Sequence, residues 1–148
     1  MRQMLETGWM HNRLRMVVAM FLTKNLLISW QEGERFFMRH LIDGDLAANN
    51  GGWQWSSSTG TDSAPYFRIF NPIAQSEKFD PEGIFIKRWL PELAGLNRKQ
   101  IHNPTAGGLF AAPDYPTPIV DLSASRARAL AAFKALPRRQ AAAALDEE

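Results

Sequence analysis

The chain has 148 residues, enough for one domain with its own core, and its 45% apolar composition excludes a disordered polymer. The absence of cysteine excludes disulfides and thiolate metal sites, and the net charge of +2 gives no overall signal of a nucleic-acid partner. No apolar run approaches the roughly 20 residues of a membrane-spanning helix, and the N-terminus lacks a signal-peptide pattern, so we expect a cytoplasmic protein outside the membrane.

The first third of the chain has helical periodicity. Residues 1–6 read as helix although no capping residue precedes them, and we therefore expect a missing upstream segment. A helix is predicted from about Trp9 to Leu27, because apolar residues recur there at spacings of three and four. A second helix should run from about Gln31 to Ile42. Asp45 should cap a third helix, from Leu46 to about Ser56.

Glycines lie inside two of these predicted helices. Gly33 weakens the first turn of the second helix. Gly51 and Gly52 each cost the third helix about 1 kcal/mol relative to alanine. We interpret this pair as a place where a neighbour packs too closely for a side chain.

After the third helix the pattern breaks into short pieces. Residues 56–65 are polar and should form a loop. Asn71 should cap a short helix that begins at Pro72, because proline suits the first helical position. The Asp80–Pro81 pair should cap another short helix, which runs through Trp89 to Pro91.

The last third begins with an irregular segment, residues 94–118, which is rich in glycine, proline and asparagine. Ser123 or Ser125 should cap a C-terminal helix within residues 119–136, and residues 137–148 should be a frayed tail. No segment alternates as a β-strand does, and no internal repeat is visible. We therefore predict a single all-α domain.

Three polar or aromatic residues share one face of the third predicted helix. Asp45, Asn49 and Trp53 follow one another at spacings of four. An acid, an amide and an indole in this arrangement could contact a ribose hydroxyl, a ring nitrogen and the ring system of an aromatic cofactor. The alternative is an N-capping Asp45 and a core Trp53 without any ligand.

A second mixed face belongs to the first predicted helix. Asn12, Arg15 and Met16 are three and four residues apart, so they lie on one side and could form a ligand wall. The alternative is a stripe that faces solvent. The three histidines have no ligand spacing, and we expect neither a metal site nor a Ser-His-Asp arrangement.

At these same residues the chain resembles the photolyase/cryptochrome family, and within it the photolyases that repair cyclobutane pyrimidine dimers. The matching strings are TGWMHNRLRM (7–16), EGERFFMRHLIDGDLAANNGGWQW (32–55), TGTDSAPYFRIFNPIAQSEKFDPEG (59–83), IKRWLPEL (86–93) and YPTPIVDLSASRARALAAFKA (115–135). The resemblance implies the C-terminal part of the helical FAD-binding domain, with the cofactor and DNA-site helices in residues 1–93. It also implies that the antenna domain, its pigment and the first half of the helical domain lie outside this chain.

The resemblance assigns cofactor roles by position. Asp43, Gly44 and Asp45 match the segment that binds FAD, with Asp45 on the adenosine or ribitol side. Asp43 would pair with Arg15 near the flavin, and the acid would help to hold a cation over an anionic ring. Asn49 matches the residue that faces the flavin N5, where its amide can tune protonation.

The resemblance also assigns electron transfer. Trp53 and Trp30 match the inner and middle members of the tryptophan chain that photoreduces the flavin. The implied activity is that of a carbon-carbon lyase. Light excites reduced FAD, an electron passes to the pyrimidine dimer, the ring opens and the electron returns.

Six further positions match the lesion pocket or the DNA backbone contacts of the family. They are Asn12, Arg13, Met16, Trp55, Arg68 and Gln75. Such an enzyme flips the dimer out of the duplex, so Trp55 would stack on the splayed bases. Arg13 and Arg68 would contact phosphates, which fix position without reading sequence. The implied partner is DNA that contains pyrimidine dimers, bound by a full-length protein that is a monomer.

Two features favour repair over light sensing. Asn49 stands where plant photoreceptors of the family carry an acid and animal ones a cysteine. Trp55 stands where receptors often carry a tyrosine. The alternatives are a truncated, non-catalytic remnant with weak flavin or DNA binding, and a cryptochrome-like photoreceptor.

Overall fold

The computed structural model describes residues 1–60, 67–106 and 115–135. Every regular element in these ranges is helical, which confirms the predicted all-α class. The elements are α1 (Arg2–Thr7), α2 (Asn12–Met20), the π-helical turn η1 (Phe21–Asn25), α3 (Trp30–His40), α4 (Leu46–Ser57), α5 (Pro72–Phe79), α6 (Ile84–Trp89), the 3₁₀ turn η2 (Pro91–Leu93) and α7 (Leu122–Ala135). None of the helices in the described ranges has the length and apolar character to cross a bilayer.

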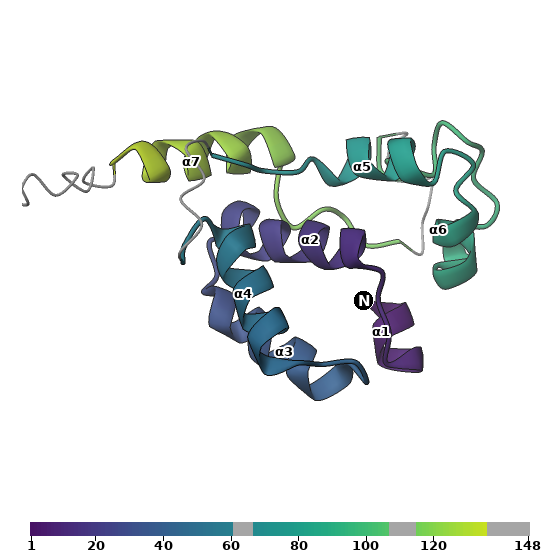
Figure 1. Ribbon diagram of the computed structural model, residues 1–148. Helices are drawn as coiled ribbons and strands as arrows, with labels where there is room; N and C mark the ends of the chain where they lie inside the picture. The colour runs from purple at the N-terminus through teal and green to yellow at the C-terminus, as the bar shows by residue number, and fades with distance from the viewer. Residues whose placement is uncertain (61–66, 107–114, 136–148) are drawn as a thin grey trace, which may run out of the picture.

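Helices α2, α3 and α4 form the centre of the arrangement. Helix α4 packs against both α3 and α2, and α7 packs against η1 (Figure 1). Helices α5 and α6 lie toward the N-terminal end of α2 (Figure 1). The end of α6 contacts α1, because the Arg2 Nη1 donates to the Trp89 carbonyl at 3.2 Å. The core cluster sits between α1, α2, α3 and α4. Its buried members are Met4, Met10, Ala19, Phe37, Leu41 and Trp53.

The N-terminal helices differ from the prediction of one helix from Trp9 to Leu27. Helix α1 ends at Gly8, which adopts a left-handed φ of 70° and donates its N–H to the Met4 carbonyl at 2.8 Å. Helix α2 then starts afresh, because His11 caps it by accepting the Arg13 N–H at its ring nitrogen, 3.0 Å away. Sequence periodicity spans this break, which is why the prediction placed the helix start too early.

The end of α2 also departs from a regular α-helix. The Leu26 N–H donates to the Phe21 carbonyl at 3.1 Å, a spacing of five residues that defines the π-helical turn η1. This turn buries two consecutive polar residues, Lys24 and Asn25, at 4% and 2% exposure. Turns of this kind are rare and occur frequently at functional sites.

Close packing between α3 and α4 occurs at Gly33 and not, as expected from the sequence, at Gly51 and Gly52. A Cβ atom on Gly33 would lie within 2.6 Å of Trp53 Cζ2, so Gly33 is the residue that allows close packing between the helices. At Gly51 and Gly52 a Cβ atom would meet no described atom within 4 Å. The expectation that a neighbour packs against this pair is therefore wrong for the described part of the chain.

Two of the predicted caps in the second half are confirmed in different ways. The Asn71 carboxamide oxygen accepts the N–H groups of Ile73 and Ala74 at 2.9 and 3.3 Å, which caps α5 as expected. Asp80 accepts the N–H groups of the first turn of α6, at 3.1 and 3.0 Å. That helix begins only at Ile84, after Gly83 with a φ of 66°, and it ends at Trp89 rather than Pro91.

The C-terminal helix is capped by Asp121, so the prediction of Ser123 or Ser125 as its cap is wrong. Helix α7 begins at Leu122, and the Asp121 carboxylate accepts the Ala124 N–H at 2.6 Å. Ser125 lies inside the helix, where its buried hydroxyl accepts a hydrogen bond of 2.8 Å from the Asn25 amide. Asp121 therefore caps the helix directly before its first residue, in place of either predicted serine. The predicted frayed tail, residues 137–148, lies outside the described residues.

Candidate functional site

A pocket of about 160 Å³ lies where α2, the α3–α4 connection and α4 meet. All five of the residues predicted to bind the cofactor line it. The lining residues are Asn12, Arg15, Met16, Ala19, Phe37, Leu41, Asp43, Gly44, Asp45, Ala48, Asn49, Gly52, Trp53 and Ser56. This pocket is smaller than the roughly 300–1,000 Å³ that ligand sites usually enclose.

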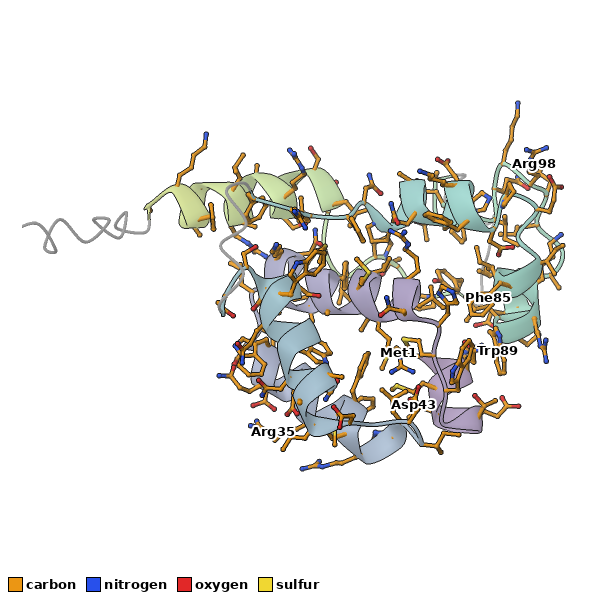
Figure 2. The ribbon with its side chains drawn as sticks, viewed as in Figure 1. Met1, Arg35, Asp43, Phe85, Trp89 and Arg98 are labelled. Carbon is orange, nitrogen blue, oxygen red and sulfur yellow. The ribbon has the colours of Figure 1, made fainter. Side chains whose placement is uncertain are left out.

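An ion pair crosses this pocket. The Arg15 Nη2 donates to both carboxylate oxygens of Asp43, at 2.9 and 2.8 Å (Asp43 is labelled in Figure 2). The Arg15 Nε donates to the Met10 carbonyl at 2.7 Å. With Nε and Nη2 both engaged, the cation has a fixed place at the pocket wall. The pair that the family resemblance implies is thus present, between residues 28 apart in sequence.

The Asn49 amide is held by a residue that the sequence reasoning missed. Its Nδ2 donates to the backbone carbonyl and the carboxylate of Glu34, at 3.0 and 3.3 Å. Glu34 is only 8% exposed. It follows Trp30 by four residues, so an acid on the buried face of an amphipathic helix was the signal that could have identified it.

Asp45 and Trp53 fit both interpretations of the α4 face. Asp45 caps the helix by accepting the Ala48 N–H at 2.7 Å, and it also lines the pocket. Trp53 is a core residue at 2% exposure, and its ring also reaches the pocket wall. A capping acid and a core indole are therefore compatible with a ligand site.

The two tryptophans predicted to transfer electrons lie in the same core region. Trp53 meets Phe37 edge to face, with ring centroids 5.0 Å apart and an interplanar angle of 76°. Trp30, at the start of α3, is half-buried and packs against the core cluster that contains both rings. Both tryptophans therefore belong to one packed region, of which Trp53 and Phe37 also line the pocket.

The residues predicted to face DNA do not form one cluster. Asn12 and Met16 line the pocket, with the Asn12 Nδ2 3.9 Å from the Met16 sulfur. Arg13 points elsewhere, because its guanidinium carbon lies 4.6 Å from the Phe79 ring centroid and 5.8 Å from that of Phe70. Arg13 therefore makes cation–π contacts with two phenylalanine rings, which the sequence did not indicate.

A second cation–π pair joins α4 to the segment before α5. The Arg68 guanidinium carbon lies 5.1 Å from the Trp55 ring centroid. Gln75 lies on α5, and its buried Oε1 finds no hydrogen-bond partner among the described residues. Trp55 and Arg68 are brought together, whereas neither lines the pocket of the cofactor residues.

A larger cavity of about 760 Å³ lies between α5, α6 and the segment that leads into α7. None of the predicted site residues lines it, and its walls are mainly apolar and proline-rich. Across residues 1–60, 67–106 and 115–135, no group of three His, Cys, Asp or Glu side chains is placed to hold a metal ion.

Comparison with known proteins identifies relatives of this chain. Residues 1–135 match the family described as the FAD binding domain of DNA photolyase. The deoxyribodipyrimidine photo-lyase of Escherichia coli K12 is 62% identical over 137 residues, which are 91% of this chain and 29% of that protein. The chain thus spans less than a third of the relative's length.

Solved structures share the arrangement of the helices. A class III photolyase from Agrobacterium tumefaciens is 49% identical, with a TM-score of 0.82 over 90% of this chain and 30% of that one. A cryptochrome from Synechocystis is 39% identical, with a TM-score of 0.82 over 88% of this chain and 29% of that one. With the match covering nearly the whole sequence and the pocket residues in place, this chain belongs to the family of FAD-binding domains of DNA photolyases.

Proposed function

We propose that this chain forms part of a light-driven DNA photolyase that uses reduced FAD to split cyclobutane pyrimidine dimers. The observation that carries the proposal is the Arg15–Asp43 ion pair, which lies on the same pocket as Asn49 and Trp53. Family membership and the similarity to the deoxyribodipyrimidine photo-lyase of E. coli support this choice of reaction.

The pocket residues fit a flavin nucleotide. Gly52 lines the pocket, and a Cβ atom built there meets no described atom within 4 Å, so open space lies against the α4 backbone. A fixed cation, an oriented amide and an indole surround that space. We therefore assign FAD binding to Arg15, Asp43, Gly44, Asp45 and Asn49, with the remaining wall supplied by another part of the full-length protein.

Each pocket residue then has a defined task. When bound, reduced FAD supplies light absorption and the electron that opens the dimer. Arg15, held by Asp43, stabilises negative charge beside it and so favours an anionic ring. Asn49, oriented by Glu34, tunes protonation at the ring nitrogen it faces. Trp53 and Trp30 carry electrons through the core toward the pocket.

The remaining family positions are assigned to the lesion and the DNA backbone. Asn12 and Met16, on the pocket wall, contact the extruded dimer. Trp55 supplies a stacking surface. Arg13 and Arg68 contact phosphates, and Gln75, whose amide oxygen has no described partner, offers a polar contact.

In the domain as a whole we assign both sites to residues 1–93, and α7 (Leu122–Ala135) packs against η1. We further propose that the full-length protein acts as a monomer in the cytoplasm. The proposed substrate is cellular DNA, and one cofactor site serves one extruded lesion.

The test combines a spectrum with a repair assay. The purified chain is incubated with FAD and desalted, and its visible spectrum gives the flavin retained per chain. After reduction it is irradiated with an oligonucleotide that contains a thymine dimer, and dimer loss is measured against a dark sample.

We expect light-dependent loss of the dimer. Retained flavin without repair would instead favour a cryptochrome-like photoreceptor. Loss of flavin on desalting, from a chain that is still helical, would assign the activity to a longer protein and leave this chain as a non-catalytic part.

A further inference from the structure

Lys24 is a buried cation that none of the roles above uses. It lies in the π-helical turn η1 and is 4% exposed. Its Nζ donates to the Ser58 hydroxyl at 2.8 Å and to the Arg68 carbonyl. The same ammonium lies 4.8 Å from the Phe67 ring centroid. Lys24 thus contacts residues on both sides of the segment 59–66.

The atoms that Lys24 contacts belong to the two segments that carry the Trp55–Arg68 pair. Ser58 is the C-terminal cap of α4, with a left-handed φ of 62°, and it follows Trp55 by one helical turn. Arg68 supplies its carbonyl to Lys24 and its guanidinium to the Trp55 ring, 5.1 Å away. One ammonium therefore connects the end of the helix that carries the indole to the backbone that carries the guanidinium.

Stability alone gives little reason to keep a charge at this place. An ion buried without a carboxylate partner is costly, and no carboxylate in the described residues forms an ion pair with Lys24. Burial, with the nearby charge of Arg68, lowers the pKa of Lys24 to about 8. A group that costs free energy of folding and forms specific contacts is a candidate for a functional role.

The other ionisable side chains around η1 do not compensate this charge. Helix α4 carries none between residues 46 and 57. On the neighbouring helices, Arg15 binds Asp43, Glu34 binds Asn49, and Arg128 donates to the Asn25 carbonyl at 2.7 Å.

We propose that Lys24 is a positioning residue of the DNA-facing surface, which holds Arg68 against Trp55 so that the indole is presented to an extruded base. This inference rests on the proposed function for its purpose. The positioning itself is a property of the chain without DNA, and it can be measured without DNA.

The primary experiment is an NMR measurement on the 148-residue chain. The ring current of Trp55 should shift the side-chain protons of Arg68 that lie above the ring upfield. Lys24→Met keeps an unbranched side chain that is one atom shorter and removes its charge and all donors, so we expect most of this shift to disappear. Lys99→Met, at an exposed lysine, is the matched control and should leave it unchanged. An unchanged Arg68 shift in folded Lys24→Met would overturn the inference.

A second measurement uses only the wild-type chain, and it tests the inference even if the Lys24→Met chain does not fold. The wild-type chain is titrated from about pH 6.5 to 9.5. We expect the Arg68 and Trp55 signals to move together with the Lys24 ammonium, because the neutral amine loses its attraction to the Phe67 ring. Signals that stay constant while Lys24 titrates would overturn the inference.

Binding to a dimer-containing oligonucleotide separates this inference from the proposed function. We expect Lys24→Met to bind about tenfold more weakly than wild type, and to have little further effect when Arg68→Ala is already present. Additive effects of the two substitutions would contradict action through Arg68. If wild type itself fails to bind, DNA binding requires a longer protein than this chain, and the NMR result still decides whether Lys24 positions Arg68.

Discussion

The indole of Trp53 occupies the place where any residue other than glycine at position 33 would carry its Cβ atom. A Cβ on Gly33 would lie within 2.6 Å of Cζ2 of that ring. The missing side chain lets α3 and α4 approach closely, and it sets the depth at which Trp53 reaches the pocket wall. A glycine that weakens a helix in isolation therefore strengthens the packing between two helices.

The first prediction concerns this contact. Gly33→Ala should destabilise the chain by about 1–3 kcal/mol, because overpacking a buried contact forces the ring or the backbone to move. The control is Gly51→Ala, where the added methyl meets no described atom and should raise the stability of α4 by up to about 1 kcal/mol. Urea unfolding of both variants measures the difference. Equal stabilities would show that the ring adapts freely.

The second prediction uses the open space at Gly52. Gly52→Leu should lower the amount of FAD retained after desalting at least tenfold while leaving helix content intact, because the new side chain fills the pocket. Gly51→Leu, one position away and outside the lining residues, should retain FAD as wild type does. The flavin absorbance per chain is the measurement. Equal retention by both variants would place the flavin elsewhere.

The third prediction concerns the Arg15–Asp43 pair. Asp43→Asn should change the free energy of unfolding by less than about 1 kcal/mol, because the carboxylate side chain is 47% exposed. Its FAD affinity should fall about tenfold, since the cation loses the acid that fixes it. Glu32→Gln, which breaks the exposed pair with Arg35, is the control and should not affect FAD binding. Titration calorimetry measures both affinities.

The fourth prediction is a pH dependence of stability. The pKa of Lys24 is lowered from 10.5 to about 8, so between these values the unfolded chain binds more protons at this residue than the folded chain. Stability should therefore rise with pH across that window, by roughly 1–2 kcal/mol after allowance for solvent screening. Unfolding measurements at about pH 7.5 and 10 should show that the free energy of unfolding rises less for Lys24→Met than for wild type. Identical slopes for the two proteins would contradict the lowered pKa.

Caps and helix class could be predicted from sequence because they depend on local chemistry. Asp45 and Asn71 act as caps as expected, since each side chain bonds to N–H groups two or three residues ahead. The boundaries near Gly8 and the π-helical turn were missed, because apolar periodicity continues through both. The cap at Asp121 was missed because two serines nearby offered the same signal.

The site was predictable only in part, because only some of its contacts lie within one helix. The Asp45–Asn49–Trp53 face follows from helical spacing within one element. The partners of Asn49 and Arg68 come from other elements. Glu34 lies 15 residues from Asn49, and Lys24 lies 44 residues from Arg68. Periodicity within a helix carries no information about such contacts, and family resemblance assigned a role to neither Glu34 nor Lys24.

The attachment of α7 has a consequence for the order of folding. The buried Asn25–Ser125 hydrogen bond joins residues 100 positions apart, whereas α2, α3 and α4 contact one another within a segment of fewer than fifty residues. Closing the longer loop costs more chain entropy before any contact offsets it. We therefore expect α1 to α4 to form the early folding nucleus and α7 to dock last. Hydrogen exchange should then report the lowest protection in α7, the helix that opens before the rest of the chain unfolds.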